Sequence, residues 1–246
     1  MAKYIILDTE TTGTDEKDKI IQLGYIVLGG QEIEVHNEFN SSDIPISYGA
    51  METHGITPEA IKNKPICIQT TAYKRLVELN NNENYLIIHN APFDITMLEK
   101  EGFVTKMKVI DTLRVAKHVF VEEEAHRLQY FRYKMELYKL EQQEAEALGI
   151  VVKAHDAIGD VLVLKLFLTK LKEAVLKMFP GENPVEKMID LTNTPILIKK
   201  FRFGKHKGKL LEEVAQEDVG YLRWMLGNME NLDDDMRYSI NFYLGA

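Results

Sequence analysis

Asp8 and Glu10 lie one residue apart at the end of an apolar run over residues 3–7. Such a run predicts a β-strand, and because side chains alternate along a strand, both carboxylates would share one face of a sheet. Two neighbouring carboxylates repel each other, and a divalent cation such as Mg²⁺ or Mn²⁺ would neutralise them, since these ions favour oxygen ligands. A solvated strand end also explains this pair taken alone. The pair therefore needs corroboration from elsewhere in the chain.

Asp94 provides a third carboxylate, in a segment that the sequence predicts to be helical from about residue 92 to residue 100. Asn90 is suited to cap the first turn of this helix. Met97 and Leu98 follow Asp94 by three and four residues, so Asp94 shares the buried face of the helix. A carboxylate on an apolar face needs a partner, although an acid near a helix N-terminus is also stabilised by the helix dipole.

Asp160 repeats this pattern in a longer predicted helix over residues 156–179, where it is aligned with a core-facing apolar stripe. Burying an ionised aspartate costs several kcal/mol unless the group is paired or bound to metal. His155 precedes Asp160 by five residues and is expected to approach from the loop or first turn, whereas a lone histidine there would usually be structural. Four acids from three elements, with a histidine nearby, predict a two-metal hydrolase site.

Five short apolar or β-branched runs are predicted to be the strands that position these residues, over residues 3–7, 20–28, 31–39, 85–88 and 107–110. Gly29 and Gly30 form a hairpin signal, so the first three runs are expected to make an antiparallel meander. The last two alternate with helix-patterned segments, which implies parallel crossovers. Further helical patterns cover residues 126–148 and 156–179. The sequence thus predicts an α/β fold with a mixed sheet of three antiparallel plus two parallel strands, flanked by helices.

The length of 246 residues fits one large domain with a small module. The large domain is expected over residues 1–179. Residues 180–195 are polar and contain a proline, so they are expected to be a linker with room for one short helix. Residues 196–246 would then form the small module. Hydrophobic residues at 45% and charged residues at 28% are typical of a soluble globular protein and exclude collagen-like, disordered and membrane-bundle classes.

A cytoplasmic location without membrane insertion is expected. The lone Cys67 has no second cysteine with which to form an internal disulfide. The apolar stretch at the N-terminus is too short for a secretory signal. The densest apolar stretch, residues 161–168, is interrupted by Lys165 and is much shorter than the ~20 residues of a membrane helix.

The net charge of −8 argues against a surface that binds nucleic acid everywhere. Residues 199–209, KKFRFGKHKGK, are an exception, because they contain six Lys or Arg residues and no acid. Lys205, Lys207 and Lys209 surround a glycine-containing turn that could neutralise DNA phosphates. Solvated lysines on a small packed appendage would give the same pattern, so both interpretations stay open.

Three segments resemble, in order and spacing, the exonuclease motifs of the DEDDh family of 3′-to-5′ exonucleases, which includes polymerase proofreading subunits, ribonuclease T and oligoribonuclease. They are ILDTETTG (6–13), HNAPFD (89–94) and HDAIGD (155–160). The resemblance covers about residues 3–178. Residues 201–226, FRFGKHKGKLLEEVAQEDVGYLRWML, are similar to the C-terminal region of a bacterial exodeoxyribonuclease.

The resemblance implies a ribonuclease-H-like fold and two divalent cations, Mg²⁺ or Mn²⁺. It implies four metal ligands, which are Asp8, Glu10, Asp94 and Asp160. His155 would be the general base. Expected substrate contacts are Thr9, Thr11, Thr12, His54, Asn90 and Phe93, together with Lys205, Lys207 and Lys209. For His54 a loop-capping role is an alternative, Asn90 also fits a role in strand-end geometry, and Phe93 also fits a core position.

Two positions depart from the family pattern. Family members commonly carry an apolar residue after the glycine of the first motif, but here Thr14 and Asp15 follow Gly13. Stacking on the terminal base is therefore open. Asp156 stands beside His155, and an acid at this place could raise the histidine pKa.

The function expected from these features is metal-dependent 3′-to-5′ exodeoxyribonuclease activity on DNA 3′ ends, releasing nucleoside 5′-monophosphates in DNA repair. Two alternatives remain at this point. One is an RNA-trimming 3′-to-5′ exoribonuclease, since nothing in the five catalytic residues would recognise a 2′-hydroxyl. The other is a polymerase-bound or DNA-bound subunit whose main role is association. A protein partner is not identified by the sequence.

Overall fold

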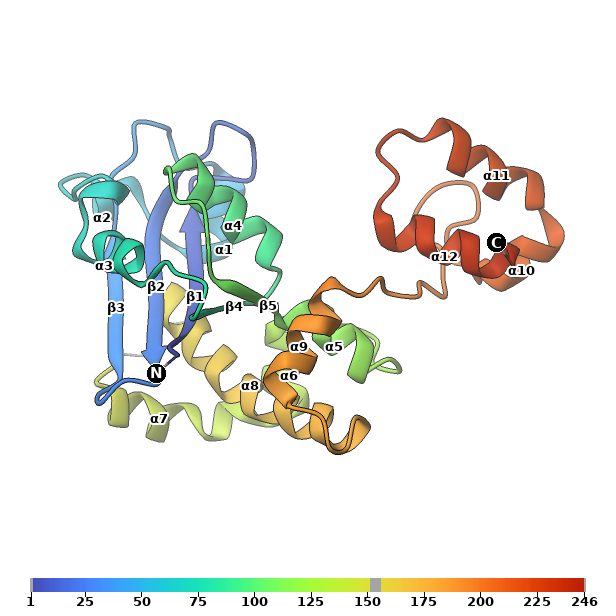
Figure 1. Ribbon diagram of the computed structural model, residues 1–246. Helices are drawn as coiled ribbons and strands as arrows, with labels where there is room; N and C mark the ends of the chain where they lie inside the picture. The colour runs from blue at the N-terminus through green and yellow to red at the C-terminus, as the bar shows by residue number, and fades with distance from the viewer. Residues whose placement is uncertain (1, 151–155, 246) are drawn as a thin grey trace. The chain divides into compact units, whose positions relative to one another are not determined.

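The computed structural model of the protein describes residues 2–150 and 156–245. It divides into two compact units, Met1–Thr192 and Asn193–Ala246. The first unit is built on a five-stranded sheet of order β3-β2-β1-β4-β5 (Figure 1). The strands are β1 (Tyr4–Thr11), β2 (Ile20–Leu28), β3 (Glu34–Phe39), β4 (Tyr85–Ile88) and β5 (Lys108–Asp111).

The strand directions confirm the predicted mixed sheet. Strand β2 pairs antiparallel with both β1 and β3, while β4 pairs parallel with β1 and with β5. Asp8 lies opposite Gly24, Glu10 lies opposite Gln22, and the register of this pair shifts between Glu10 and Thr11. The carboxyl end of β1, which carries the two acids, is therefore next to β2.

Helices cover both faces of the sheet (Figure 1). They are α1 (Tyr48–His54), α2 (Pro58–Ile61), α3 (Thr71–Leu79), α4 (Ala91–Lys100), α5 (Thr112–Val119), α6 (Leu128–Lys134), α7 (Glu141–Leu148), α8 (Ala157–Met178) and α9 (Pro184–Asn193), with short 3₁₀ helices η1 (Cys67–Gln69) and η2 (Leu137–Lys139). Ile6 faces the core built with α5 to α9, whereas Ile5 and Leu7 face the core built with α3 and α4. This alternation is what a strand buried on both sides requires.

The segment 126–148 differs from the single helix that its pattern predicts. It forms α6, η2 and α7, and the interruption coincides with Glu136, whose φ of 56° is in the left-handed region that a helix cannot continue through. Phe131 and Leu137 on either side are fully buried. Packing of these two side chains against the core accounts for the break.

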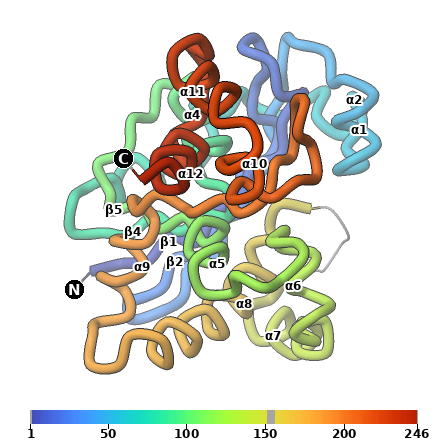
Figure 2. The backbone as a smooth tube through the Cα atoms, turned by 90° about the vertical axis from the view of Figure 1, so that its right-hand side faces the viewer, coloured from blue at the N-terminus to red at the C-terminus, as the bar shows by residue number. Residues whose placement is uncertain are grey.

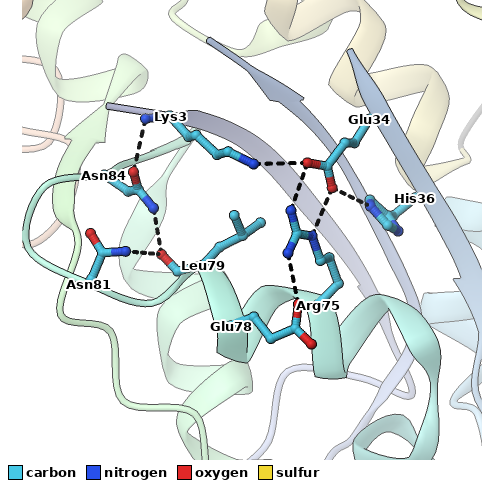
Figure 3. Close-up of polar contacts among 8 residues, drawn as sticks. All are labelled: Lys3, Glu34, His36, Arg75, Glu78, Leu79, Asn81 and Asn84. Atoms are coloured by element: carbon cyan, nitrogen blue, oxygen red, sulfur yellow. Dashed lines mark hydrogen bonds and ion pairs between the residues drawn. The ribbon is translucent and has the colours of Figure 1, made fainter. Parts of the chain in front are cut away.

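Glu34 at the start of β3 ties the edge of the sheet to its surroundings (Figure 3). Its carboxylate accepts hydrogen bonds from Arg75 Nε and Nη2 of α3, both at 2.8 Å, and from Lys3 Nζ at 3.0 Å. His36 Nε2 lies 3.4 Å from the same carboxylate. Strand β3, helix α3 and the start of β1 are thus joined by one acid.

The segment 180–195, expected as a linker, mostly belongs to the first unit. Helix α9 buries Met188 and Leu191 in the core that contains α8. Thr192 Oγ1 accepts a hydrogen bond from the backbone N–H of Asp111 at 3.0 Å, and Arg114 Nε donates to the carbonyl of Thr192 at 2.7 Å. The division between the units therefore follows Thr192, because the apolar side of α9 has a core to pack against.

The second unit contains α10 (Leu211–Glu217), α11 (Val219–Asn228) and α12 (Asp234–Leu244), which are grouped together in Figure 2. Its small core includes Phe201, Leu211, Leu222, Met225 and Ile240. The basic segment before α10 turns back on itself, since Lys200 and Leu210 form an antiparallel bridge. Within the residues that the structure describes, no helix combines the length and apolar character needed to cross a membrane.

Candidate active site at the end of strand β1

Three of the predicted acids converge in the first unit. The carboxylates of Asp8 and Glu10 from β1 and of Asp160 from the first turn of α8 place ligand oxygens within 4.8 Å of one another. Each of these residues is partly exposed. The arrangement offers several oxygen donors to one small, accessible volume, which is what a hard divalent cation requires.

Gly24 explains how α8 comes so close to β1. A Cβ atom at this position would lie 2.9 Å from the backbone nitrogen of Ile158 and 3.0 Å from Ala157 Cβ. Only glycine allows the start of the helix to contact the sheet beside Asp8. The first turn of α8, with Asp160, is thereby held against the strand pair. Gly24 is not among the residues predicted for the site, although an isolated glycine within a strand often marks a close approach of another backbone.

Gln22, opposite Glu10 on β2, fixes the same helix end. Its Oε1 accepts a hydrogen bond from the backbone N–H of Ala157 at 3.3 Å, and its Nε2 donates to Asp156. Gln129 of α6 donates from Nε2 to Asp160 Oδ1 at 2.7 Å. These two amide side chains orient the start of α8 and its carboxylate, and no local sequence signal pointed to them.

Asp94 approaches the cluster from α4 and is almost fully buried. Its Oδ1 accepts hydrogen bonds from the backbone N–H of Thr9 at 3.0 Å and from Thr9 Oγ1 at 2.7 Å. Thr9 lies between Asp8 and Glu10, so the hydrogen bonds bring Asp94 to the same end of β1. Burial raises the pKa of Asp94 to about 7, against the lowering effect of the Thr9 hydrogen bonds.

The electrostatics of the cluster oppose ionisation. Burial, followed by the charges of Asp94 and Asp160, raises the pKa of Asp8 well above its usual value. Burial and the charges of Asp160 and Asp94 raise the pKa of Glu10 to about 8. Repulsion among like charges at a partly buried site is relieved either by protons or by a bound cation. The carboxylate oxygens of this cluster therefore fit a divalent metal ion.

His155 falls outside the described residues. Its predicted role as general base stays a prediction that depends on its place five residues before Asp160. Asp156, the first described residue after it, is the N-cap of α8 and accepts the hydrogen bond from Gln22.

A pocket of about 380 Å³ lies beside Glu10. Four of the predicted substrate contacts line it, namely Thr9, Thr11, His54 and Phe93. The N-terminal turn of α1 forms a further part of its wall. The pocket is thus placed to hold a molecule against the carboxylate cluster.

His54 both shapes this pocket and closes a loop. Its Nδ1 accepts a hydrogen bond from the backbone N–H of Ile56 at 2.9 Å, so Nε2 carries the proton of the neutral ring and donates to the carbonyl of Thr11 at 3.1 Å. Burial lowers the pKa of His54. The loop-capping alternative thus describes its hydrogen bonds, while its position also makes it part of the pocket wall.

Two predicted contacts of the first unit, Thr12 and Asn90, are not part of the pocket lining. Thr12 is fully buried, and its Oγ1 donates to Asp18 Oδ1 at 2.7 Å. Asn90 precedes α4 but makes no side-chain cap, so the predicted capping is wrong. Its left-handed φ of 76° differs from the extended backbone of a capping residue, and its N–H instead donates to Asp111 Oδ1 at 3.1 Å.

The three predicted phosphate-binding lysines lie on the second unit and are exposed. Lys205 Nζ is 2.7 Å from Asp218, and Lys209 Nζ is 2.8 Å from Glu217. Exposed ion pairs of this kind contribute little to stability and exchange readily.

Two family models and several known proteins match the chain. The family model described as "Exonuclease" matches residues 5–168, and the one described as "Exodeoxyribonuclease X-like C-terminal" matches residues 201–230. The chain is 27% identical over 241 residues to "Exodeoxyribonuclease 10" of Escherichia coli K12, covering 97% of both chains. It is 38% identical over 135 residues to the "DNA polymerase III subunit epsilon" of Rickettsia prowazekii, covering 48% of this chain and 56% of that one.

Solved structures show the same fold. "Exonuclease X in complex with 5′ overhanging duplex DNA" superposes with a TM-score of 0.56 at 21% identity, covering 78% of this chain and all of that one. E. coli Exonuclease I in complex with a dA16 oligonucleotide superposes with a TM-score of 0.54 at 18% identity, covering 77% of this chain and 42% of that one. The first family model matches more than half of this chain, and the chain therefore belongs to the exonuclease family.

Proposed function

We propose that the protein is a divalent-cation-dependent 3′-to-5′ exodeoxyribonuclease that releases nucleoside 5′-monophosphates from DNA ends and acts in DNA repair. The observation that carries this proposal is the convergence of Asp8, Glu10 and Asp160 within 4.8 Å. The raised pKa values of Asp8 and Glu10 and the adjoining pocket fit a site that holds both cations and a terminal nucleotide.

The cations would be two Mg²⁺ or Mn²⁺ ions held by Asp8, Glu10, Asp94 and Asp160. When bound, such a pair stabilises the attacking and departing oxygens of a phosphodiester displacement. Asp94 would need to be ionised for this role, and its two hydrogen bonds from Thr9 favour the ionised form. A positive charge in the cluster would lower the raised pKa values of Asp8, Glu10 and Asp94, since it stabilises the ionised carboxylates.

The protein's own groups would place the terminal nucleotide and move one proton. Thr9, Thr11, His54 and Phe93 line the pocket and would hold the 3′-terminal nucleotide beside Glu10. A ring nitrogen of His155 would take the proton from the attacking water. The oxygen of that water would then bond to phosphorus, while the 3′-oxygen of the preceding nucleotide leaves and is protonated.

DNA is favoured as the substrate by the relatives. The similarity to an exodeoxyribonuclease covers 97% of both chains, which includes the second unit as well as the nuclease unit. The two structural neighbours are complexes with DNA. The cytoplasmic location expected from the single cysteine belongs to the same proposal.

Cleavage of end-labelled substrates tests the proposal. Single-stranded DNA, duplex DNA and RNA, each labelled at the 5′ end, would be incubated with Mg²⁺ or with EDTA, with the Asp8→Asn variant as the control for contaminating nucleases. We expect the labelled DNA to shorten progressively in Mg²⁺ and to stay intact in EDTA. Immediate release of a labelled mononucleotide would contradict the polarity, and faster degradation of RNA than of DNA would contradict the substrate.

A further inference from the structure

Trp224 of α11 is exposed in an unusual setting. Its side chain is 52% exposed, although its neighbours Leu222 and Met225 are fully buried on the inner side of the same helix. The indole ring lies 6.0 Å from the ring of Tyr221, centroid to centroid, with 25° between the planes. A single exposed apolar residue is common on protein surfaces, so the groups around the indole decide whether this one has a function.

Two of the helix positions next to Trp224 carry no side chain. Gly220 lies four residues before it and Gly227 three residues after it, and such positions are neighbours on a helix surface. Asn228, four residues after Trp224, donates its side-chain amide to the carbonyl of Trp224 at 2.9 Å. This amide is therefore engaged with the backbone.

Neither glycine is needed for packing or backbone conformation. A Cβ atom at Gly227 would meet no atom within 4 Å, and one at Gly220 would meet only Asp218 Oδ1 at 3.9 Å. Neither has a left-handed φ. Glycine within a helix costs up to roughly 1 kcal/mol relative to alanine, so two of them weaken α11 without a local structural return. Their effect is that no side chain from positions 220 and 227 covers the indole of Trp224.

Positive charge lies beside this aromatic surface. Lys205 Nζ is 5.9 Å from the centroid of the Tyr221 ring, and Arg223 is exposed on α11. The nearby Asp218 accepts from Lys205 at 2.7 Å, from His206 at 3.0 Å and from the N–H of Tyr221 at 3.2 Å. The Lys205 and His206 hydrogen bonds lower the pKa of Asp218 to about 2. Asp218 is thus already paired with Lys205 within the unit, through an exposed ion pair that exchanges readily.

We propose that Trp224, left open by Gly220 and Gly227 and adjacent to Lys205, is a stacking site for an unpaired base of single-stranded DNA. Aromatic side chains beside cations bind single strands because the ring stacks on the base while the cation neutralises phosphate. The bases inside a duplex already stack on each other, so a single strand is favoured. The inference rests on the proposed action on DNA and adds to it a binding site outside the nuclease unit.

The fluorescence of Trp224 provides a direct test, because the chain contains only this tryptophan. The full-length protein would be titrated in EDTA with oligo(dT) or with a blunt duplex of equal length. Additions of buffer alone would be the blank. We expect quenching by oligo(dT) as the indole stacks on a base, and a weaker response to the duplex. Saturation of the protein with oligo(dT) would be established independently, from the anisotropy of labelled DNA. Unchanged Trp224 fluorescence at saturation would overturn the proposal.

Two substitutions separate stacking from structure. Trp224→Ala should weaken binding of labelled oligo(dT) by between about 5-fold and about 150-fold, the usual range for losing one stacked base, while Trp224→Phe should retain most of the affinity. Gly227→Leu should cover the indole, so affinity should fall while thermal stability stays equal or rises through better helix propensity. Gln216→Leu, at an exposed position of α10, is the matched control and should not change affinity.

Other outcomes are equally decisive. The stacking site would be overturned if Trp224→Ala or Gly227→Leu bound oligo(dT) with the affinity of wild type. It would also be overturned if Trp224→Ala abolished binding of a protein partner and left DNA affinity intact. Nuclease polarity and metal need are measured separately in the cleavage assay. Quenching by oligo(dT) without any exonuclease activity would therefore contradict the proposed function and still support this site.

Discussion

Two groups of acids on the same sheet are in opposite electrostatic conditions. At the edge, Glu34 is surrounded by Arg75 and Lys3 and approached by His36 (Figure 3). Hydrogen bonds from Arg75, above all, hold the pKa of Glu34 well below its usual range. At the end of β1, Asp8 and Glu10 face other carboxylates, and their pKa values are raised.

The contrast separates an acid that stabilises the fold from acids that the fold tolerates for another purpose. The partners of Glu34 stabilise its ionised form in the folded protein, so no further ligand is needed. Ionisation of the cluster at Asp8 destabilises the folded protein, so a bound cation would stabilise it. The same kinds of substitution and the same changes of pH, applied to both places, test this difference.

Removing one charge at a time should give the largest difference between the two groups. Asp8→Asn or Asp160→Asn should reduce cleavage roughly a thousandfold or more, since several kcal/mol of transition-state stabilisation by the cations would be lost. In EDTA the same variants should be as stable as wild type or more stable. Glu34→Gln should do the reverse, with lower thermal stability and nearly unchanged turnover. Turnover within tenfold of wild type in Asp8→Asn would contradict the metal site.

His155→Ala should have the next largest effect, a loss of roughly 10²- to 10⁴-fold in turnover, which is what a positioned general base contributes. Affinity for Mn²⁺, measured by calorimetry, should stay close to that of wild type. If His155→Ala loses Mn²⁺ affinity as severely as Asp8→Asn does, the histidine is a ligand and its assignment as base is wrong.

The stability of the cation-free protein should depend on pH in the sense opposite to ordinary acid denaturation. The pKa values of Glu10 and Asp94 rise from 4.5 to about 8 and from 3.8 to about 7 on folding, so the folded state binds more protons than the unfolded chain between these limits. Stability should therefore increase as pH falls from about 8 to about 5 in EDTA. Scanning calorimetry at several pH values checks this.

Two controls sharpen the pH experiment. Saturating Mg²⁺ should raise the melting temperature most at pH 8 and flatten the dependence, because the cation replaces protons in the cluster. Asp8→Asn should show a shallower dependence than wild type in EDTA, whereas Glu34→Gln should keep the wild-type slope above pH 5. A wild-type melting temperature that falls steadily from pH 8 to pH 5 in EDTA would refute the raised pKa values.

Replacing the lysines of the second unit should have the smallest effect. Gln at Lys205, Lys207 and Lys209 should reduce the salt dependence of long-DNA binding by about one unit of log slope for each phosphate contact removed. Lys205 and Lys209 are ion-paired with Asp218 and Glu217, but such exposed pairs exchange readily, so all three lysines should contribute to the change. Turnover on a short oligonucleotide should be nearly unaltered.

A truncation complements the lysine variants, and it should end after Thr194. Cutting after Phe179 would remove α9, whose Met188 and Leu191 belong to the core of the first unit. Unaltered affinity and unaltered salt slope for long DNA in both the truncated and the lysine-substituted proteins would show that the second unit has a different role.

Local patterns in the sequence are enough to predict the strands, most of the helices and the acids of the site. The apolar run of β1, the apolar stripe of α8 and the hairpin glycines after β2 each involve residues only a few positions apart. The order of strands and helices then restricts the sheet to a mixed one. For this reason the sequence alone predicts that Asp8, Glu10 and Asp160 belong to one site.

The tertiary structure alone decided how closely these parts meet. Gln22 and Ala157 are 135 residues apart in sequence, and Thr9 and Asp94 are 85 apart, so their hydrogen bonds leave no local pattern. Gly24 is one glycine among 15 until α8 is seen 2.9 Å from where its Cβ would be. Packing likewise drew α9 into the first unit. Local periodicity specifies which face of an element is apolar, but the contact that this face makes depends on the whole chain having folded.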